Sequence, residues 1–549
     1  MRNIAETNGV FVKAYAGTTG VLLAMDIDPT KRDGLLGFAI QRYNAFNDST
    51  GWLMGALHFP RAPHTPGWLV PSNVAPIQKF RWSDYRVYPD SEYRYTVHPV
   101  YPPWDNPRLE RGPEVVVKTA SLNDGKHRII FNRAAAASQA FAHRFEDYIK
   151  ELNAALKAQQ PAPPLPPKAL TWLSRGLLEQ ILAFIQRAKG ASWALDIAIY
   201  EYELPAIVQA VQDAHNRQVR VRVIYHGKPG DEQTRINCAN LVGLPEELKR
   251  ERITSKIFHH KFIVLSRLVQ GEYQPQAVLC GSTNFTENGV YRQGNVVHIL
   301  ESPEISRQYQ DLFEVIFNGG SVTDTRKFIN QNNPVDLGNA LFAGFSPRSN
   351  GNDLNALINL VDHANRDVLF CTAFNLYDGL EQSLLGAPND SILRYGLQNT
   401  RSRITGIHAD RTASFSATAL YSRGLEGWIK ESTYGQRGNI LIHTKMIIVD
   451  FTSDQPVVIS GSHNFSKSAS SGNDENFLAI RSDTEVADMY GCELLRFYDH
   501  YRFRFHLAER LRKGVTQVPL TLTEDQSWTK RYFEDDPLKI LDRLRFAGR

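Results

Sequence analysis

His259-His260-Lys261-Phe262-Ile263-Val264-Leu265 and His443-Thr444-Lys445-Met446-Ile447-Ile448-Val449 are two copies of one pattern, in which a histidine and a lysine precede an apolar run. Each copy is followed by another apolar run and a polar loop, Gly281-Ser282-Thr283-Asn284 in the first and Gly461-Ser462-His463-Asn464 in the second. Apolar runs of this length are typical of buried strands. The histidines at 259 and 443 are 184 positions apart, and this long repeat predicts two similar α/β halves.

The residue types in each copy suit an anion. Side chains two positions apart in a strand share a face, so each histidine points the same way as the lysine of its own copy. Glycine permits close backbone approach, and serine and asparagine supply hydrogen-bond donors. Brought together, the two copies would surround one anion with imidazoles, ammonium groups and polar loops. The residues expected there are His259, Lys261, His443 and Lys445, with Ser282, Asn284, Ser462 and Asn464 from the loops.

The pattern His-x-Lys-x4-Asp followed by Gly-Ser-x-Asn, once per half, resembles the signature of the phospholipase D superfamily over roughly residues 170–510. The resemblance implies a two-step displacement without metal or cofactor: one histidine attacks phosphorus to give a phosphohistidine, and the other protonates the leaving alcohol and then activates water. The lysines and loop residues would neutralise the non-bridging oxygens. Asp450 completes the pattern after Lys445 and is expected to be structural, whereas Ser266 stands at this place in the first copy.

The two copies also differ eleven residues after the loop asparagine, where the first has Asn295 and the second has Glu475. A carboxylate can fix the tautomer of an imidazole and stabilise its cation, whereas an amide can orient but not neutralise it. Family resemblance suggests that this group reaches the histidine of the opposite half. We therefore predict that Glu475 supports His259 as nucleophile and that His443 is the acid and base, with the reverse assignment left open. Asn295 is placed among the substrate-binding residues.

Alternating elements surround both motifs. Helices are expected at 177–188, 205–216 and 353–365, and strands at 195–200, 219–225 and 368–374. The start of the chain has short strand-like runs between turn residues, which predicts an all-β sandwich. Residues 114–118 and 127–131 flank Asn123-Asp124-Gly125 and are expected to form a hairpin. Residues 87–97 resemble the corner of a fibronectin type III module. The predicted domains are a β-sandwich at 1–132, a helix and proline-rich linker at 133–167, two phospholipase D-like halves at 168–335 and 336–515, and a C-terminal tail at 516–549.

Composition sets further bounds. The chain has 549 residues, 42% hydrophobic and 22% charged, which is ordinary for a soluble protein of several domains. A net charge of +4 does not by itself indicate a nucleic acid or anionic membrane partner. Residues 1–10 lack the plan of a secretion signal, and no apolar run approaches the ~18 residues of a membrane span. We expect a cytoplasmic protein without an integral membrane segment, and four buried free thiols at Cys238, Cys280, Cys371 and Cys492.

Three functions remain compatible with the sequence. A phosphodiesterase acting on a nucleic-acid backbone is narrowly favoured over a phospholipase D acting on lipid head groups, because no Trp/Leu-rich loop lies near either motif. A catalytically weak binding module is the third, since the first copy lacks both motif carboxylates. The partner is therefore a phosphodiester substrate, nucleic acid or phospholipid, and a monomer is possible because one chain carries both half-sites.

Overall fold

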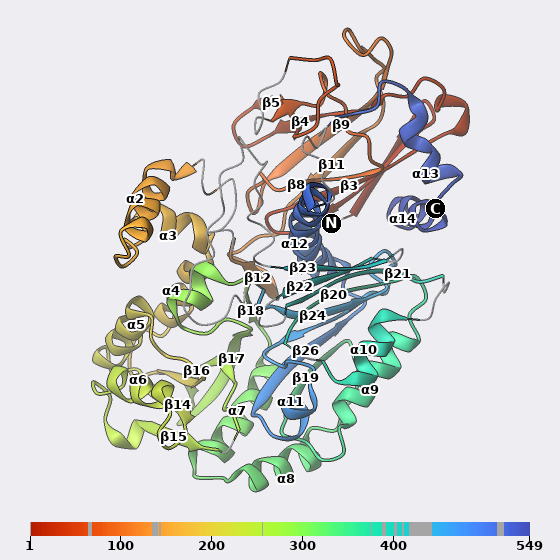
Figure 1. The fold of residues 1–549 in the computed structure, drawn as a ribbon. Helices are drawn as coiled ribbons and strands as arrows, with labels where there is room; N and C mark the ends of the chain where they lie inside the picture. Colours follow the sequence, from red (N-terminus) through yellow and green to blue (C-terminus); the bar gives the residue numbers. More distant parts are fainter. Residues whose placement is uncertain are drawn as a thin grey trace.

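The computed structural model describes residues 2–549 except 64–68, 134–140, 142–143, 255, 375, 387–390, 400–402, 409–410, 417–441 and 513–520. Figure 1 shows two α/β halves side by side below a β-rich N-terminal part, with the long helix α12 (Thr484–Arg512) running between the lower and upper parts. Among the described residues, no helix is both long and apolar enough to cross a bilayer.

The first half is built on a seven-stranded sheet in the order β12-β18-β17-β16-β13-β14-β15. Its strands are β12 (His127–Phe131), β13 (Trp193–Ile199), β14 (Arg220–Gly227), β15 (Lys249–Ile253), β16 (Lys261–Val269), β17 (Glu272–Gly281) and β18 (Val296–Leu300). Its helices are α4 (Leu177–Gln186), α5 (Pro205–Asn216), α6 (Glu232–Asn240), α7 (Pro303–Phe317) and α8 (Val322–Asn332).

The second half repeats this plan in an eight-stranded sheet, in the order β19-β26-β25-β24-β20-β21-β22-β23. Its strands are β19 (Leu341–Ser346), β20 (Asp367–Ala373), β21 (Leu393–Asn399), β22 (Arg403–His408), β23 (Arg411–Ser416), β24 (Lys445–Val449), β25 (Val457–Gly461) and β26 (Glu475–Arg481). With α12, its helices are α9 (Asn352–Asp362), α10 (Asp378–Leu385) and α11 (Lys467–Ser471). The predicted duplication is thereby confirmed, and the expected helices and strands lie within a few residues of α4, α5, α9, β13, β14 and β20.

Alternating side chains join the two sheets into one body. Along β16, Phe262 and Val264 face a core that includes α7 and residues of the second half, such as Met446 and Ile448 of β24. Ile263, between them, faces the opposite way, into a separate core with α4 and α5. Because one apolar core lies between the sheets, the edges that carry both His-x-Lys segments are held at a fixed distance.

The hairpin expected between residues 114–118 and 127–131 is wrong. Strand β11 (Glu114–Lys118) pairs with β9 (Glu92–Tyr101), whereas β12 pairs with β18 of the first half. In the second half, β19 pairs in the same antiparallel way with β26. Each half therefore begins with one edge strand of its own sheet, and pairing along that edge outweighs the local turn signal.

Residues before β12 form two larger antiparallel sheets, β1-β2-β3-β8 and β10-β9-β4-β5 with β11 on β9, and a small two-stranded sheet, β6-β7. Their likeness to a fibronectin type III module stays a prediction. The described end of the chain closes their core, where Trp528 stacks on Phe80 at 5.3 Å between ring centroids. The remaining elements are β1 (Arg2–Thr7), β2 (Val10–Ala16), β3 (Val21–Ile27), β4 (Gly37–Asn44), β5 (Ser49–Trp52), β6 (Met54–Gly55), β7 (Val70–Pro71), β8 (Arg81–Asp84), β10 (Arg108–Leu109), α2 (Glu146–Lys157), α3 (Pro167–Ser174), α13 (Lys530–Phe533) and α14 (Pro537–Ala547).

Two surface features complete the fold. Cys238 is exposed on α6, so the prediction that all four thiols are buried is wrong for this one, because α6 turns that side to solvent.

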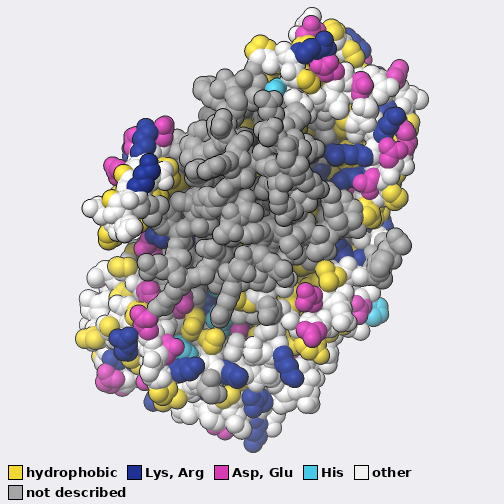
Figure 2. Space-filling model, viewed as in Figure 1, with side chains coloured by type: hydrophobic (Ala, Val, Ile, Leu, Met, Phe, Trp, Pro, Cys, Tyr) yellow, Lys and Arg dark blue, Asp and Glu magenta, His cyan; other side chains and the backbone are white. Residues whose placement is uncertain are grey.

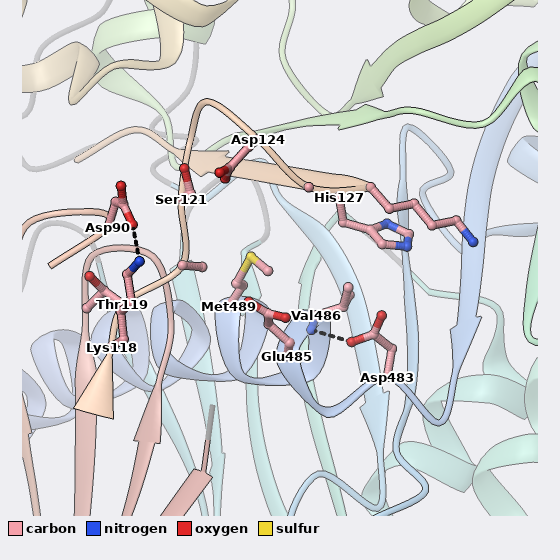
Figure 3. A pocket seen from close by; sticks show the side chains of 13 residues that line it. Asp90, Lys118, Thr119, Ser121, Asp124, His127, Asp483, Glu485, Val486 and Met489 are labelled. Atoms are coloured by element: carbon pink, nitrogen blue, oxygen red, sulfur yellow. Dashed lines mark hydrogen bonds and ion pairs between the residues drawn. The ribbon is translucent and has the colours of Figure 1, made fainter. Parts of the chain in front are cut away.

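A cavity of about 330 Å³ lies where the N-terminal part meets the start of α12 (Figure 3). Lys118 pairs with Asp90 at its rim at 2.7 Å, and Asp483 accepts from Val486 N at 2.9 Å. The cavity contains none of the motif residues.

Candidate active site

Backbone hydrogen bonds across the pseudo-twofold axis fasten each His-x-Lys segment to the opposite half. His259 N donates to Asp474 O at 2.9 Å, and His443 N donates to Gly294 O at the same distance. Asp474 and Gly294 are equivalent positions, each one residue before the polar residue that differs between the copies. The half-sites are thus joined by the backbone itself, and their side chains converge.

The two histidines face one another with 6.3 Å between ring centroids, and both are buried. His259 Nδ1 lies 2.7 Å from Glu475 Oε2 of the second half. His443 Nδ1 lies 3.0 Å from Asn295 Oδ1 and 3.2 Å from Ser282 O of the first half. Because these partners are acceptors, each Nδ1 carries the proton, and Nε2 is the nitrogen that remains for a phosphorus atom or a leaving oxygen.

The electrostatics of the site favour neutral imidazoles while it holds no anion. Burial, with Lys261 and Lys445 nearby, holds the pKa of His259 well below its usual value. The pKa of His443 is also held well below its usual value, by burial and then by the same two lysines. Burial raises the pKa of Glu475, against the positive charge of nearby groups. An arriving anion would raise both histidine pKa values again, because opposite charge favours the protonated form.

The two lysines are buried on the same strand faces as the histidines. Lys261 Nζ donates to His259 O at 2.8 Å, and burial lowers its pKa to about 7. Lys445 Nζ has no hydrogen-bond partner among the described residues, and burial lowers its pKa well below the usual value. Each ammonium group lies near a ring of its own half, 5.3 Å from Tyr200 and 6.0 Å from Phe374. An unsatisfied buried cation is costly in a folded protein, so this arrangement suits an anionic ligand.

In the two polar loops, the serine side chains are hydrogen-bonded within the protein, whereas one oxygen of each loop asparagine has no partner among the described residues. Ser282 Oγ donates to Asn295 Oδ1 at 2.8 Å, and Ser462 Oγ accepts from Asn476 N at 3.0 Å. These contacts suit positioning of the loops, and the expected contact of both serines with substrate stays a prediction. The Oδ1 atoms of Asn284 and Asn464 are buried without hydrogen-bond partners among the described residues.

Asn295 is hydrogen-bonded within the protein. Its Oδ1 accepts from Ser282 and His443, and its Nδ2 donates to Gly289 O at 2.9 Å. Both amide atoms therefore have partners within the protein, and Oδ1 lies where it can orient His443. The expected contact of Asn295 with substrate stays a prediction. Asp450 lies at the far end of β24, in a left-handed conformation with φ of 56°. It accepts from Arg366 N at 2.7 Å, which fixes the turn before β20.

Two features of the site carry no motif signal. Glu201 follows β13 and accepts from Asn284 Nδ2 at 2.5 Å. Arg252 of β15 forms a buried ion pair with Asp474, with Nη2 to Oδ1 at 2.8 Å. A carboxylate next to the end of a central strand was the available signal for Glu201, because strand ends deliver side chains to the site edge. Among the described residues, no cluster of three or more His, Cys, Asp or Glu has an arrangement that could hold a metal ion.

Comparison with known proteins finds one matching family model and one curated relative. A family model described as "Cardiolipin synthase, PLD-like domain" matches residues 181–317 and 402–497, which lie in both halves. The chain is also 29% identical over 129 residues to the mitochondrial cardiolipin hydrolase of Xenopus laevis. That match covers 23% of this chain and 55% of the relative, so the chain spans about half the length of the curated relative.

Solved structures give weaker likenesses. Phosphatidylserine synthase from Haemophilus influenzae has a TM-score of 0.39 at 14% identity, over 64% of this chain and 94% of its own. The phospholipase D family member Nuc from Salmonella typhimurium has a TM-score of 0.20 at 23% identity, over 25% and 84%. A mutant of the yeast tyrosyl-DNA phosphodiesterase has a TM-score of 0.30 at 12% identity, over 55% and 85%. All these TM-scores are below 0.5, so these likenesses identify no substrate.

Proposed function

Because this chain belongs to the phospholipase D superfamily, we propose that it hydrolyses phosphodiesters through a phosphohistidine intermediate, with a nucleic-acid backbone as the favoured substrate. The observation that carries the proposal is the pair of facing imidazoles, with 6.3 Å between their ring centroids. The Nδ1 atom of each ring is hydrogen-bonded to the opposite half. This separation suits a single tetrahedral phosphate between the two Nε2 atoms. Buried Lys261 and Lys445 supply the charge for its non-bridging oxygens.

The two histidines would take different roles because their partners differ. Glu475 is a carboxylate and can stabilise the cation that His259 becomes when Nε2 attacks phosphorus. Asn295 is neutral, so it orients His443 without stabilising the cation that forms when Nε2 is protonated. His443 can then give a proton to the leaving alkoxide and take one from the water that opens the phosphohistidine.

The Glu475→Gln variant is expected to keep the contact with His259 Nδ1 but lose its charge. We predict a fall in kcat of about 10²–10³-fold on bis(p-nitrophenyl) phosphate, the usual cost of one electrostatic partner. Asp450→Asn, at the far end of β24, is the matched control and should stay within a few-fold of wild type. Equal activity of Glu475→Gln and wild type would contradict the role of Glu475.

Nucleic acid is favoured because of a basic rim next to the site, which we define as Lys256, Arg326 and Lys467. The stem of Lys256 packs on Gly472, where an added β-carbon would lie 3.1 Å from its Cγ. Arg326 donates to Ser471 O at 2.9 Å, and Lys467 is exposed at the start of α11. In the view of Figure 2, Lys and Arg side chains lie along the lower part of the molecule. Lys467 belongs to the segment that leads to Glu475, and Lys256 and Arg326 contact that segment. The three cations therefore suit the phosphates that flank a scissile bond.

Hydrolysis of bis(p-nitrophenyl) phosphate in EDTA tests the reaction, and single-stranded DNA, RNA and lipid vesicles test the substrate. We expect metal-independent turnover and binding of single strands that weakens steeply with salt. Replacing Lys256 and Lys467 by Gln should reduce the slope of log K against log[salt] by about 1.4, that is about 0.7 for each lost phosphate contact. The control is Lys150→Gln, an exposed lysine on α2 that pairs with Glu146.

Phospholipid is the second candidate, because the matching family model and the Xenopus relative both carry cardiolipin in their descriptions. Cleavage of cardiolipin or phosphatidylcholine vesicles, with an unchanged salt slope in the rim variants, would favour it. Binding of single strands without any turnover would instead favour the third function, a catalytically weak binding module. A cytoplasmic location and a monomeric state remain part of the proposal.

A further inference from the structure

Glu201 brings a second carboxylate into the site. Its backbone is fixed against the first polar loop, because Phe285 N donates to Glu201 O at 3.1 Å. Its Oε2 accepts from Asn284 Nδ2 at 2.5 Å. The loop asparagine therefore holds the carboxylate on the side of the site where the two lysines lie.

The charges around Glu201 come from three elements. Lys261 on β16 and Lys445 on β24 attract its charged form, whereas Glu203 on its own segment repels it. The attraction is reciprocal, since Glu201 favours the charged forms of both lysines. With Glu475, the site holds two lysines and two carboxylates beside two neutral imidazoles. The charges of the lysines and of the carboxylates therefore offset one another before a substrate arrives.

The two carboxylates are distributed in a complementary way. Tyr200 and Phe374 are equivalent, since each ring lies near the histidine and the lysine of its own half. Glu201 follows Tyr200 in the sequence, whereas Asn375 follows Phe374 and lies outside the described residues. The second half has Glu475 where the first has Asn295. Each half thus supplies one carboxylate at a position where the other half has asparagine.

We propose that Glu201 is a specificity-determining residue, which with Glu475 limits the pocket to one negative charge and so selects monoanionic diesters against dianionic monoesters. This inference rests on the proposed phosphodiesterase function. A phosphodiester carries one negative charge, whereas a phosphomonoester carries about 1.5 to 2 at pH 7. Hydrolysis of a diester by water gives a monoester and an alcohol. The negative charge of Glu201 therefore repels the monoester product more strongly than the monoanionic diester substrate.

The effect has a defined pH dependence. Burial raises the pKa of Glu201 to about 7. Above that pH the carboxylate is charged, so its repulsion of a dianion is fully present there. As the pH falls through about 7, Glu201 takes up a proton and the repulsion is lost. A monoester also takes up a proton near pH 6, which lowers its charge in the same direction.

The test compares wild type with Glu201→Gln, which keeps an oxygen for Asn284 but removes the charge. Phenyl phosphate is the probe, as a competitive inhibitor of bis(p-nitrophenyl) phosphate hydrolysis. At pH 8 we expect a Ki about tenfold lower in the variant, because one like charge has been removed at close range. The KM for the diester should change less than about threefold, and the two Ki values should converge by pH 6. The control is Glu287→Gln, an exposed carboxylate that pairs with Arg292.

Two further measurements keep the outcomes distinct. Calorimetric binding of phenyl phosphate needs no turnover, so it tests Glu201 even if wild type hydrolyses no diester, a result that would overturn only the proposed function. Glu201→Asp retains the charge and should reject phenyl phosphate nearly as wild type does. Equal affinity of folded wild type and Glu201→Gln for phenyl phosphate at pH 8 would overturn the inference. So would a Glu201→Asp variant that binds it as tightly as Glu201→Gln.

Discussion

The His443→Asn variant is expected to release one equivalent of p-nitrophenolate from bis(p-nitrophenyl) phosphate in a burst and then stall. His259, supported by Glu475 at 2.7 Å, can still attack phosphorus, and p-nitrophenolate leaves without a proton donor. The water that must open the phosphohistidine then lacks its base. His259→Asn should give no burst, and both variants should lose about 10⁴-fold or more in steady-state turnover, as is usual when a nucleophile or its base is removed.

The measurement is a rapid-mixing burst followed by peptide mapping after an alkaline quench, which protects phosphohistidine. A p-nitrophenyl phosphoryl group, which is what remains after one p-nitrophenolate has left, should be found on His259 in the His443→Asn protein. The two variants are matched controls for each other, since each removes one imidazole from the same pocket. A burst in His259→Asn, with the p-nitrophenyl phosphoryl group on His443, would reverse the two roles. No burst in either variant of an active enzyme would exclude a covalent intermediate.

Loss of Arg252 is expected to cost about 3–5 kcal/mol in the free energy of unfolding, the usual cost of breaking a buried ion pair from one side. Arg252 joins the two halves: Nη2 donates to Asp474 Oδ1 at 2.8 Å and to Thr325 Oγ1 at 2.9 Å. The Asp474 side chain is fully buried. Arg252→Ala leaves that carboxylate without its cation, next to Glu475 and to the backbone that holds His259.

Urea unfolding at two pH values checks this expectation. Burial raises the pKa of Asp474, and Arg252 opposes that rise, so its pKa should increase further in the variant. A raised carboxylate pKa in the folded state costs stability above that pKa and less below it. The deficit should therefore be large at pH 8 and smaller at pH 5.5. Arg252→Met with Asp474→Asn should recover part of it. Arg307→Ala is the control on α7, and an equal loss there would contradict the ion-pair explanation.

The sequence indicated which residues come together in the site better than it indicated their hydrogen-bond partners. The repeated His-x-Lys segments and loops follow from local pattern, because alternation along a strand fixes which side chains share a face. The cross-half reach of Glu475 came from family resemblance, and the structure provides its 2.7 Å distance to His259. The hydrogen bonds of Asn295 to Ser282 and Gly289 were not predicted, because an amide in a motif gives no sign of which partners use its atoms. Glu201 was missed because a lone glutamate after a strand has no pattern of its own.

The sequence alone determined that there are two α/β halves and which imidazoles and ammonium groups they carry, since these follow from periodicity and residue type. Only the tertiary structure decided that β12 joins the first half's sheet, because pairing with β18 involves residues about 170 positions away. It also decided which partner each histidine Nδ1 meets and that Arg252 meets Asp474. Contacts between distant segments depend on how the two sheets pack on their shared core, and no local stretch of chain encodes that packing.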